Sequence, residues 1–117
     1  MLLVDTSVWI DHFRHRDARL SAALEAGEVL THPFVIGELA CGGFRGRAQV
    51  LTLLGQLPSA SAAEHEEVMH LIDVHQLAGS GVGWIDAHIL AAARISGASL
   101  WTHDAALERA WQRVSRG

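Results

Sequence analysis

Short apolar runs alternate with longer segments of helical periodicity along this chain. The runs that predict strands are residues 2–5 (LLVD), 29–31 and 99–102, with a weaker signal at 59–62. A short apolar run that polar residues bring to an end is typical of a strand buried on both faces of a parallel sheet. Strands that alternate with helices predict an α/β fold, with right-handed crossovers and helices on both faces of the sheet.

The segments between these runs predict the helices. Gly27 and Gly97 are placed to end two of them, because glycine readily adopts the left-handed conformation that stops a helix. The stretch GSGVG at 79–83 predicts a turn. Helices are expected over residues 6–14, 18–26, 33 to the glycines at 42 and 43, 47–57, 64–77, 84–95 and 104–114. With no repeat or internal linker, residues 1–117 are expected to form a single domain.

Composition and charge argue against several classes of protein. Half of the residues are apolar, so the chain can bury a core, and the formal net charge of −4 argues against binding through a general basic surface. Cys41 is the only cysteine, which excludes a disulfide framework and favours a reducing compartment; we expect it to be a small buried hydrophobe in a helix. The sequence shows neither a signal peptide nor a membrane-spanning stretch, so a cytoplasmic protein is expected.

Four acidic residues lie inside or directly after apolar segments, where an uncompensated charge is costly. They are Asp5 in LLVD, Glu38 in GELACG, Asp86 in GWIDAHIL and Asp104 after SLWTH. Asp5 and Asp104 follow predicted strands, and ligands of parallel sheets bind beyond the carboxyl ends of the strands. Oxygen ligands suit hard cations such as Mg²⁺ and Mn²⁺. The pattern therefore indicates a divalent-metal site assembled from distant parts of the chain.

Each acid also has a structural interpretation. Asp5 and Asp104 are placed to cap the helices that follow them, and Asp86 could interact favourably with the dipole of its own helix. Glu38 is harder to explain in this way, because it lies in the middle of an apolar helix. Taken together, the four acids favour a site over four separate caps.

Three segments resemble those of PIN-domain proteins, specifically VapC-type toxins: VDTSVWIDHF, GELACG and GVGWIDAHILAAARISGASLWTHDAAL. The resemblance implies a three-layer α/β/α sandwich around a mostly parallel sheet. It also implies a Mg²⁺- or Mn²⁺-dependent endoribonuclease, the toxin of a type II toxin–antitoxin pair, which inhibits translation by cleaving structured RNA of the tRNA or rRNA class. A homodimer and a VapB-type antitoxin would be its protein partners.

The resemblance also assigns roles to residues. The catalytic, metal-binding acids would be Asp5, Glu38, Asp86 and Asp104. Supporting hydroxyl groups would be those of Thr6, Ser7 and Thr102. No further acid follows Asp104 until Glu108, so the pattern leaves open whether Asp104 contacts the metal directly.

Arginines and apolar residues near these acids suggest how partners could bind. Four arginines could hold the RNA backbone if they flank the acidic pocket, and are otherwise solvated surface charges. They are Arg14, Arg16, Arg45 and Arg47. The helix at 47–57 carries more apolar residues than one core-facing stripe needs, and the surplus would suit either a groove for a partner helix or simple burial. These residues are Val50, Leu51, Leu53, Leu54 and Leu57.

Histidine and tryptophan carry weaker signals. The histidines form no zinc-binding pattern, so most are expected to be solvated, although His12 and His15 lie near Asp5 in sequence and could touch substrate. The pattern places most of the tryptophans in the core, with the option that one at the rim stacks on a base: Trp9, Trp84, Trp101 and Trp111.

Two other functions use the same residues. Asp5 at a strand end could be the nucleophile of an aspartyl-phosphate phosphotransferase or phosphatase, but such enzymes usually need a second Asp two residues later, where this chain has Ser7. A non-catalytic PIN-like interaction module is the third possibility. It is disfavoured because all four acids are present.

Overall fold

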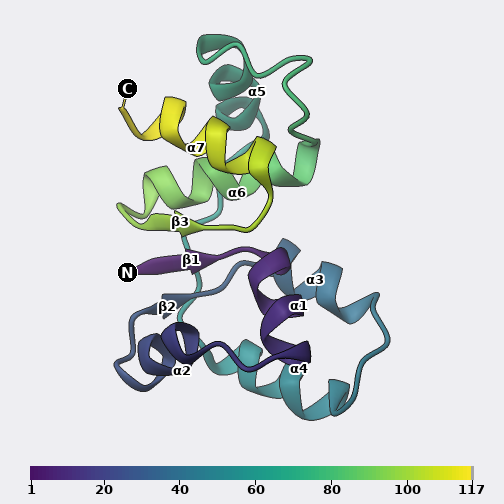
Figure 1. Cartoon of the computed structure of the whole chain (residues 1–117). Helices are drawn as coiled ribbons and strands as arrows, with labels where there is room; N and C mark the ends of the chain where they lie inside the picture. The colour runs from purple at the N-terminus through teal and green to yellow at the C-terminus, as the bar shows by residue number, and fades with distance from the viewer. Residues whose placement is uncertain (117) are drawn as a thin grey trace.

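Within the described residues, three parallel strands form the central sheet, in the order β2-β1-β3 (Figure 1). The structure is a computed structural model that describes residues 1–116. The strands are short: β1 spans Leu2–Val4, β2 spans Val29–Leu30 and β3 spans Ser99–Trp101. The middle strand places Leu3 opposite Leu30 on one side and opposite Leu100 on the other. All three of these leucines are buried, which is why the runs read as continuously apolar.

Seven helices lie along the described chain, and Figure 1 shows α1–α4 towards the β2 side of the sheet and α5–α7 towards the β3 side. This arrangement confirms the predicted α/β fold with helices on both sides of a parallel sheet. The helices are α1 (Thr6–Arg14), α2 (Ala18–Glu25), α3 (Pro33–Ala40), α4 (Arg47–Gln56), α5 (His65–Val74), α6 (Trp84–Ile95) and α7 (Ala105–Arg116).

Helix α6 is the centre of the core on the β3 side. It packs against β3, α5 and α7, and six of its twelve residues are buried. Four of these are alanines, whose small side chains let neighbouring elements approach the helix closely. Gly97 then ends the helix region with φ +64°, and Gly27 does the same after α2 with φ +69°, as predicted.

The secondary structure departs from the sequence prediction in two places. The weak strand at 59–62 is reduced to one parallel bridge between Ser59 and Thr31. The helix predicted to reach Leu77 ends at Val74, because the chain enters the left-handed region at Gln76, with φ +54°. A non-glycine residue rarely adopts this conformation, so the sequence contains no stop signal there.

Two predicted core residues lie at the surface instead. Cys41 is exposed, because it follows Leu39, the last buried residue of α3, and caps the helix at the turn towards α4. Trp84 is 42% exposed at the first position of α6, where its ring packs edge-on against His88, with 4.6 Å between ring centroids. The prediction holds for Trp9, which is buried, whereas Trp101 and Trp111 are partly buried.

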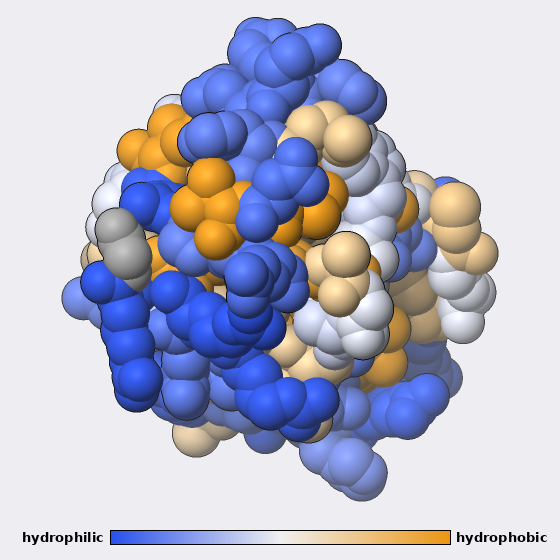
Figure 2. Space-filling view, turned by 90° about the horizontal axis from the view of Figure 1, so that it is seen from above, coloured by the Kyte–Doolittle hydropathy of each residue, from blue (hydrophilic) through white to orange (hydrophobic). Residues whose placement is uncertain are grey.

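The face over α5 and α7 is largely hydrophilic, with separate apolar patches between the polar side chains (Figure 2). Met69 and Val74 on α5 are among the exposed large apolar residues. None of the helices in residues 1–116 combines the length and the apolar character needed to cross a lipid bilayer.

Candidate active site

Asp5 is the most firmly held of the four acids. It follows β1, is 6% exposed and caps α1. Three hydrogen bonds reach the same oxygen, Oδ2: from the Ser7 hydroxyl at 2.7 Å, the Thr102 hydroxyl at 2.8 Å and the Ser7 amide at 3.4 Å. Within residues 1–116, Oδ1 has no hydrogen-bond donor. One oxygen is therefore anchored and the other is available to a ligand.

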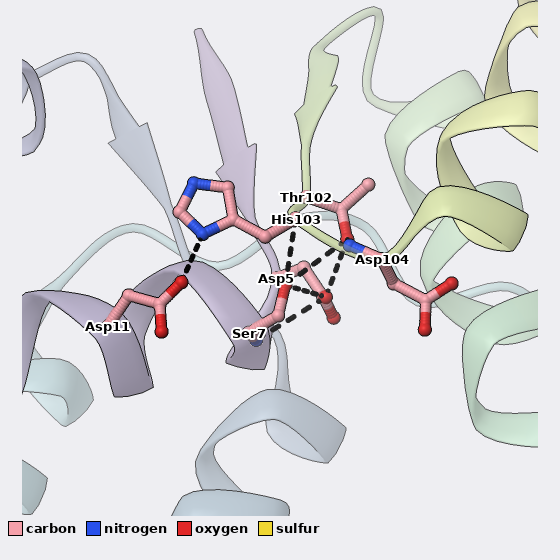
Figure 3. A network of polar contacts seen from close by, with 6 residues as sticks. All are labelled: Asp5, Ser7, Asp11, Thr102, His103 and Asp104. Carbon is pink, nitrogen blue, oxygen red and sulfur yellow. Dashed lines mark hydrogen bonds and ion pairs between the residues drawn. The ribbon is translucent and has the colours of Figure 1, made fainter.

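The same two hydroxyl groups join the start of the chain to the turn after β3. Ser7 Oγ accepts from the His103 amide at 2.9 Å, and Thr102 Oγ1 accepts from the Asp104 amide at 3.0 Å. In Figure 3, both hydroxyls point to the carboxylate of Asp5. Ser7 and Thr102 thus hold Asp5 and Asp104 in a fixed relation, with Thr102 bonded to Asp5 across 97 residues of sequence.

Glu38 and Asp86 reach the site from two helices. Glu38 lies on α3, and its Oε1 accepts a hydrogen bond from the Thr6 hydroxyl at 3.2 Å. Asp86 lies in the first turn of α6, and its Oδ2 accepts from the Gly83 amide at 3.4 Å. Each predicted supporting hydroxyl, on Thr6, Ser7 and Thr102, is therefore hydrogen-bonded to one of the predicted acids.

The acids interact through their charges. Burial raises the pKa of Glu38, and the negative charges of Asp5 and Asp86 raise it further, against the opposing hydrogen bond from Thr6. Burial likewise raises the pKa of Asp86, with additional contributions from Asp5 and Asp104 and an opposing one from the Gly83 amide. The four acids are therefore linked into one electrostatic cluster, in which each influences the charge of at least one other; that they share one ion stays a prediction.

The donor set fits a hard divalent cation that keeps much of its water. In residues 1–116, no three Asp, Glu, His or Cys side chains lie close enough together to enclose an ion. Mg²⁺ does not require such an enclosure, because it usually binds through one or two carboxylates and retains several waters. A cation could bind the free Oδ1 of Asp5, and its charge would offset the burial and the like charges that raise the pKa of Glu38 and Asp86.

The capping interpretations hold alongside the cluster. Asp5 caps α1 through Oδ2. Asp104 Oδ1 accepts from the Leu107 amide at 2.9 Å and so caps α7. Because a carboxylate has two oxygens, one can cap a helix while the other faces the site. The two interpretations weighed from the sequence are therefore compatible.

The four predicted arginines separate into two pairs. Arg14 and Arg45 line a cavity of about 410 Å³ together with Glu38. Arg16 instead donates to the Ser21 hydroxyl at 3.1 Å, and Arg47 donates to the Ala40 carbonyl at 2.6 and 3.1 Å, which satisfies the end of α3. The structure thus brings only the first pair to the wall formed by Glu38.

One polar pair beside the cluster has no signal in the sequence. His103 Nδ1 lies 2.5 Å from Asp11 Oδ2, and Figure 3 shows the ring turned to Asp11 and away from the carboxylate of Asp5. His32, unlike His103, is an exception to the expected solvated histidines. It is buried, its Nδ1 accepts from the Phe34 amide, and burial lowers its pKa.

An apolar groove lies between α1 and α4, as one interpretation of the helix at 47–57 required. Its volume is about 720 Å³. Leu54 is buried beneath it, whereas Leu53 is 62% exposed at its edge. The groove is lined by Trp9, His12, Phe13, Arg16, Leu24, Val50, Leu53, Leu54, Gln56 and Leu57. The surplus apolar residues of α4 therefore form a surface recess as well as core.

Comparison with known proteins identifies the family. The PIN domain family model matches residues 2–111. Among the similar proteins are two named Ribonuclease VapC32, from Mycobacterium tuberculosis strains CDC 1551 / Oshkosh and ATCC 25618 / H37Rv. Each is 46% identical over 111 residues, which cover 94% of this chain and 90% of the relative. With its parallel α/β fold and its four clustered acids, the chain belongs to the PIN-domain family and is of the VapC type.

Proposed function

We propose that the protein is a Mg²⁺- or Mn²⁺-dependent endoribonuclease, the toxin of a type II toxin–antitoxin pair, which inhibits translation by cleaving tRNA or rRNA in the cytoplasm. The observation that carries the proposal is the electrostatic cluster of Asp5, Glu38, Asp86 and Asp104. Membership of the PIN-domain family and the similarity to proteins named ribonucleases support it.

The acids of the cluster would hold the cation, with the direct contribution of Asp104 the least constrained because one of its oxygens caps α7. When bound, the cation would supply a water of lowered pKa and would stabilise charge developing on the phosphoryl group. Ser7 and Thr102 orient Asp5 in advance, and Thr6 orients Glu38. Since the pKa values of Glu38 and Asp86 are raised, protons compete with the cation for these groups, and activity should fall in acid.

The partners follow from the same proposal. The groove between α1 and α4 would receive an apolar helix of a VapB-type antitoxin. A homodimer would bury the exposed apolar side chains of Phe34, Trp84 and Ile85, which lie on the helices that carry Glu38 and Asp86. Co-expression with a VapB-type antitoxin should suppress toxicity, and Leu53→Asp should weaken that suppression.

The decisive experiment compares RNA cleavage by Asp5→Asn and Glu38→Gln with that of Glu25→Gln, a matched change at an exposed acid on α2. We expect at least about a hundredfold loss in the first two variants and none in the control, and we expect EDTA to abolish cleavage. Circular dichroism verifies that the variants are folded. Wild-type rates in both site variants would overturn the assignment, and activity that persists in EDTA would overturn the metal dependence.

A further inference from the structure

A separate recess opens directly beside Glu38, between α1 and the turn that joins α3 to α4. Its volume of about 410 Å³ lies within the range of roughly 300–1,000 Å³ that is typical of small-molecule sites. The side chains that matter in it are Ile10, Phe13, Arg14, Glu38, Phe44 and Arg45. Aromatic, aliphatic and cationic groups thus share one cavity with a member of the acidic cluster.

Two phenylalanine rings, stacked on each other, line this recess. The rings of Phe13 and Phe44 are stacked, with centroids 4.7 Å apart and planes inclined by 13°. Both are partly buried, and Ile10 beside them is exposed. Stacking covers one face of each ring, so a planar heterocycle can extend the pair on an outer ring face. Single-stranded RNA is commonly held by stacking its bases on aromatic side chains in this way.

Two arginines supply the charge. Arg14 ends α1 and Arg45 lies in the turn before α4, and both are exposed. Within residues 1–116, neither has a hydrogen-bond or ion-pair partner, in contrast to Arg16 and Arg47. A guanidinium group binds phosphate through paired hydrogen bonds, so this pair is available to an anion that enters the recess.

We propose that this recess binds a single nucleotide of the RNA substrate, the one next to the phosphodiester that is cleaved. The base lies on an outer face of the stacked Phe13–Phe44 pair, and its phosphate contacts Arg14 and Arg45. Glu38 forms a wall of both the recess and the acidic cluster, so a nucleotide bound here adjoins the reacting phosphate. The proposal rests on the proposed ribonuclease function and adds a source of base preference to it.

The recess can be tested without any cleavage. We would titrate the protein in EDTA with each of the four nucleoside 5′-monophosphates and follow the aromatic NMR signals of Phe13 and Phe44. The double variant Arg14→Ala/Arg45→Ala should bind about tenfold more weakly or worse. The control Arg109→Ala/Arg116→Ala removes two exposed charges on α7, outside the recess, and should bind within about twofold of wild type. Equal weakening in both variants would mean a general charge effect and would overturn the proposal.

Cleavage of RNA with randomised sequence provides the second measurement. The Arg14→Ala/Arg45→Ala variant should raise KM about tenfold with kcat nearly unchanged. Phe44→Leu keeps apolar volume without a flat ring and should lose the base preference beside the cleaved bond. The recess proposal alone would be overturned by two results together: Asp5-dependent cleavage with wild-type KM in the Arg14→Ala/Arg45→Ala variant, and no nucleotide-induced shift at Phe13 or Phe44. Nucleotide binding at the recess in a protein that cleaves no RNA would support the recess and refute the proposed ribonuclease.

Discussion

Replacing Thr102 by Val should destabilise the protein even when no metal or RNA is present. Thr102 is 8% exposed; its hydroxyl donates to Asp5 at 2.8 Å and accepts from the Asp104 amide at 3.0 Å. Valine has nearly the same shape, so the change removes mainly these two hydrogen bonds. A hydrogen bond to a charged group contributes about 1.5–3 kcal/mol, whereas water can replace part of the bond to the Asp104 amide, which is only partly buried. Ser7 still donates to Asp5, so we expect the lower end, about 2 kcal/mol.

Urea unfolding in EDTA, followed by tryptophan fluorescence, measures this loss. A decrease of about 2 kcal/mol corresponds to a drop in Tm of roughly 6–10 °C for a domain of this size. Thr52→Val is the matched control, because the exposed Thr52 hydroxyl donates only to the Ala48 carbonyl of its own helix, and it should change stability by no more than about 0.5 kcal/mol. Thr102→Ser should recover most of the loss. If Thr102→Val unfolds like the control, the hydroxyl does not hold the two turns together.

Further predictions concern charge, backbone and thiol. In EDTA at neutral pH, Glu38→Gln and Asp86→Asn should each stabilise the fold by about 0.5 kcal/mol, because burial and like charges raise the wild-type pKa values. A raised pKa means that the ionised carboxylate destabilises the folded state at neutral pH, and that this penalty disappears as the pH falls and the group is protonated. The advantage of both variants should therefore vanish near pH 4 in urea titrations; a pH-independent difference would contradict this reasoning. Gly81→Ala should cost about 1–2 kcal/mol, because φ is +91° and the new Cβ would lie 3.2 Å from the Ala106 methyl group, whereas Gly55→Ala in α4 should gain about 0.5–1 kcal/mol in the same assay. The exposed thiol of Cys41 should react with Ellman's reagent in the native protein, and protection until unfolding would disprove its placement.

The elements that the sequence predicted well are those with a local physical signal. Gly27 and Gly97 mark helix ends because a left-handed backbone favours glycine, and Pro33 marks the start of α3 because its ring suits the first turn. The parallel sheet could be predicted because each of its strands is a short apolar run between helical segments, which is also a local signal. The end of α5 was missed because Gln76 adopts a left-handed conformation that its residue type does not announce.

Each of the four acids stands out in the sequence because it lies in an apolar context that a charge would avoid. The orientation of their side chains could not be predicted, because it depends on contacts between residues far apart in sequence. The hydrogen bond from Thr102 to Asp5 is one example, and the placement of Arg45 beside Glu38 while Arg47 bonds to Ala40 is another. Periodicity predicts which face of a helix a residue lies on but not which partner its side chain contacts. Arg45 and Arg47 therefore look alike in the sequence although their contacts differ.

The link between Asp5 and Thr102 also bears on when during folding the site can appear. Closing a loop of this length has a high entropic cost, which is recovered only when the flanking elements pack. In a chain in which β1 has paired with β2 but not yet with β3, Asp5 has no hydrogen bond from Thr102, and Asp104 does not lie beside it. Partly folded forms of this protein should therefore not cleave RNA, and the proposed activity should appear together with the native tertiary structure in a single cooperative step.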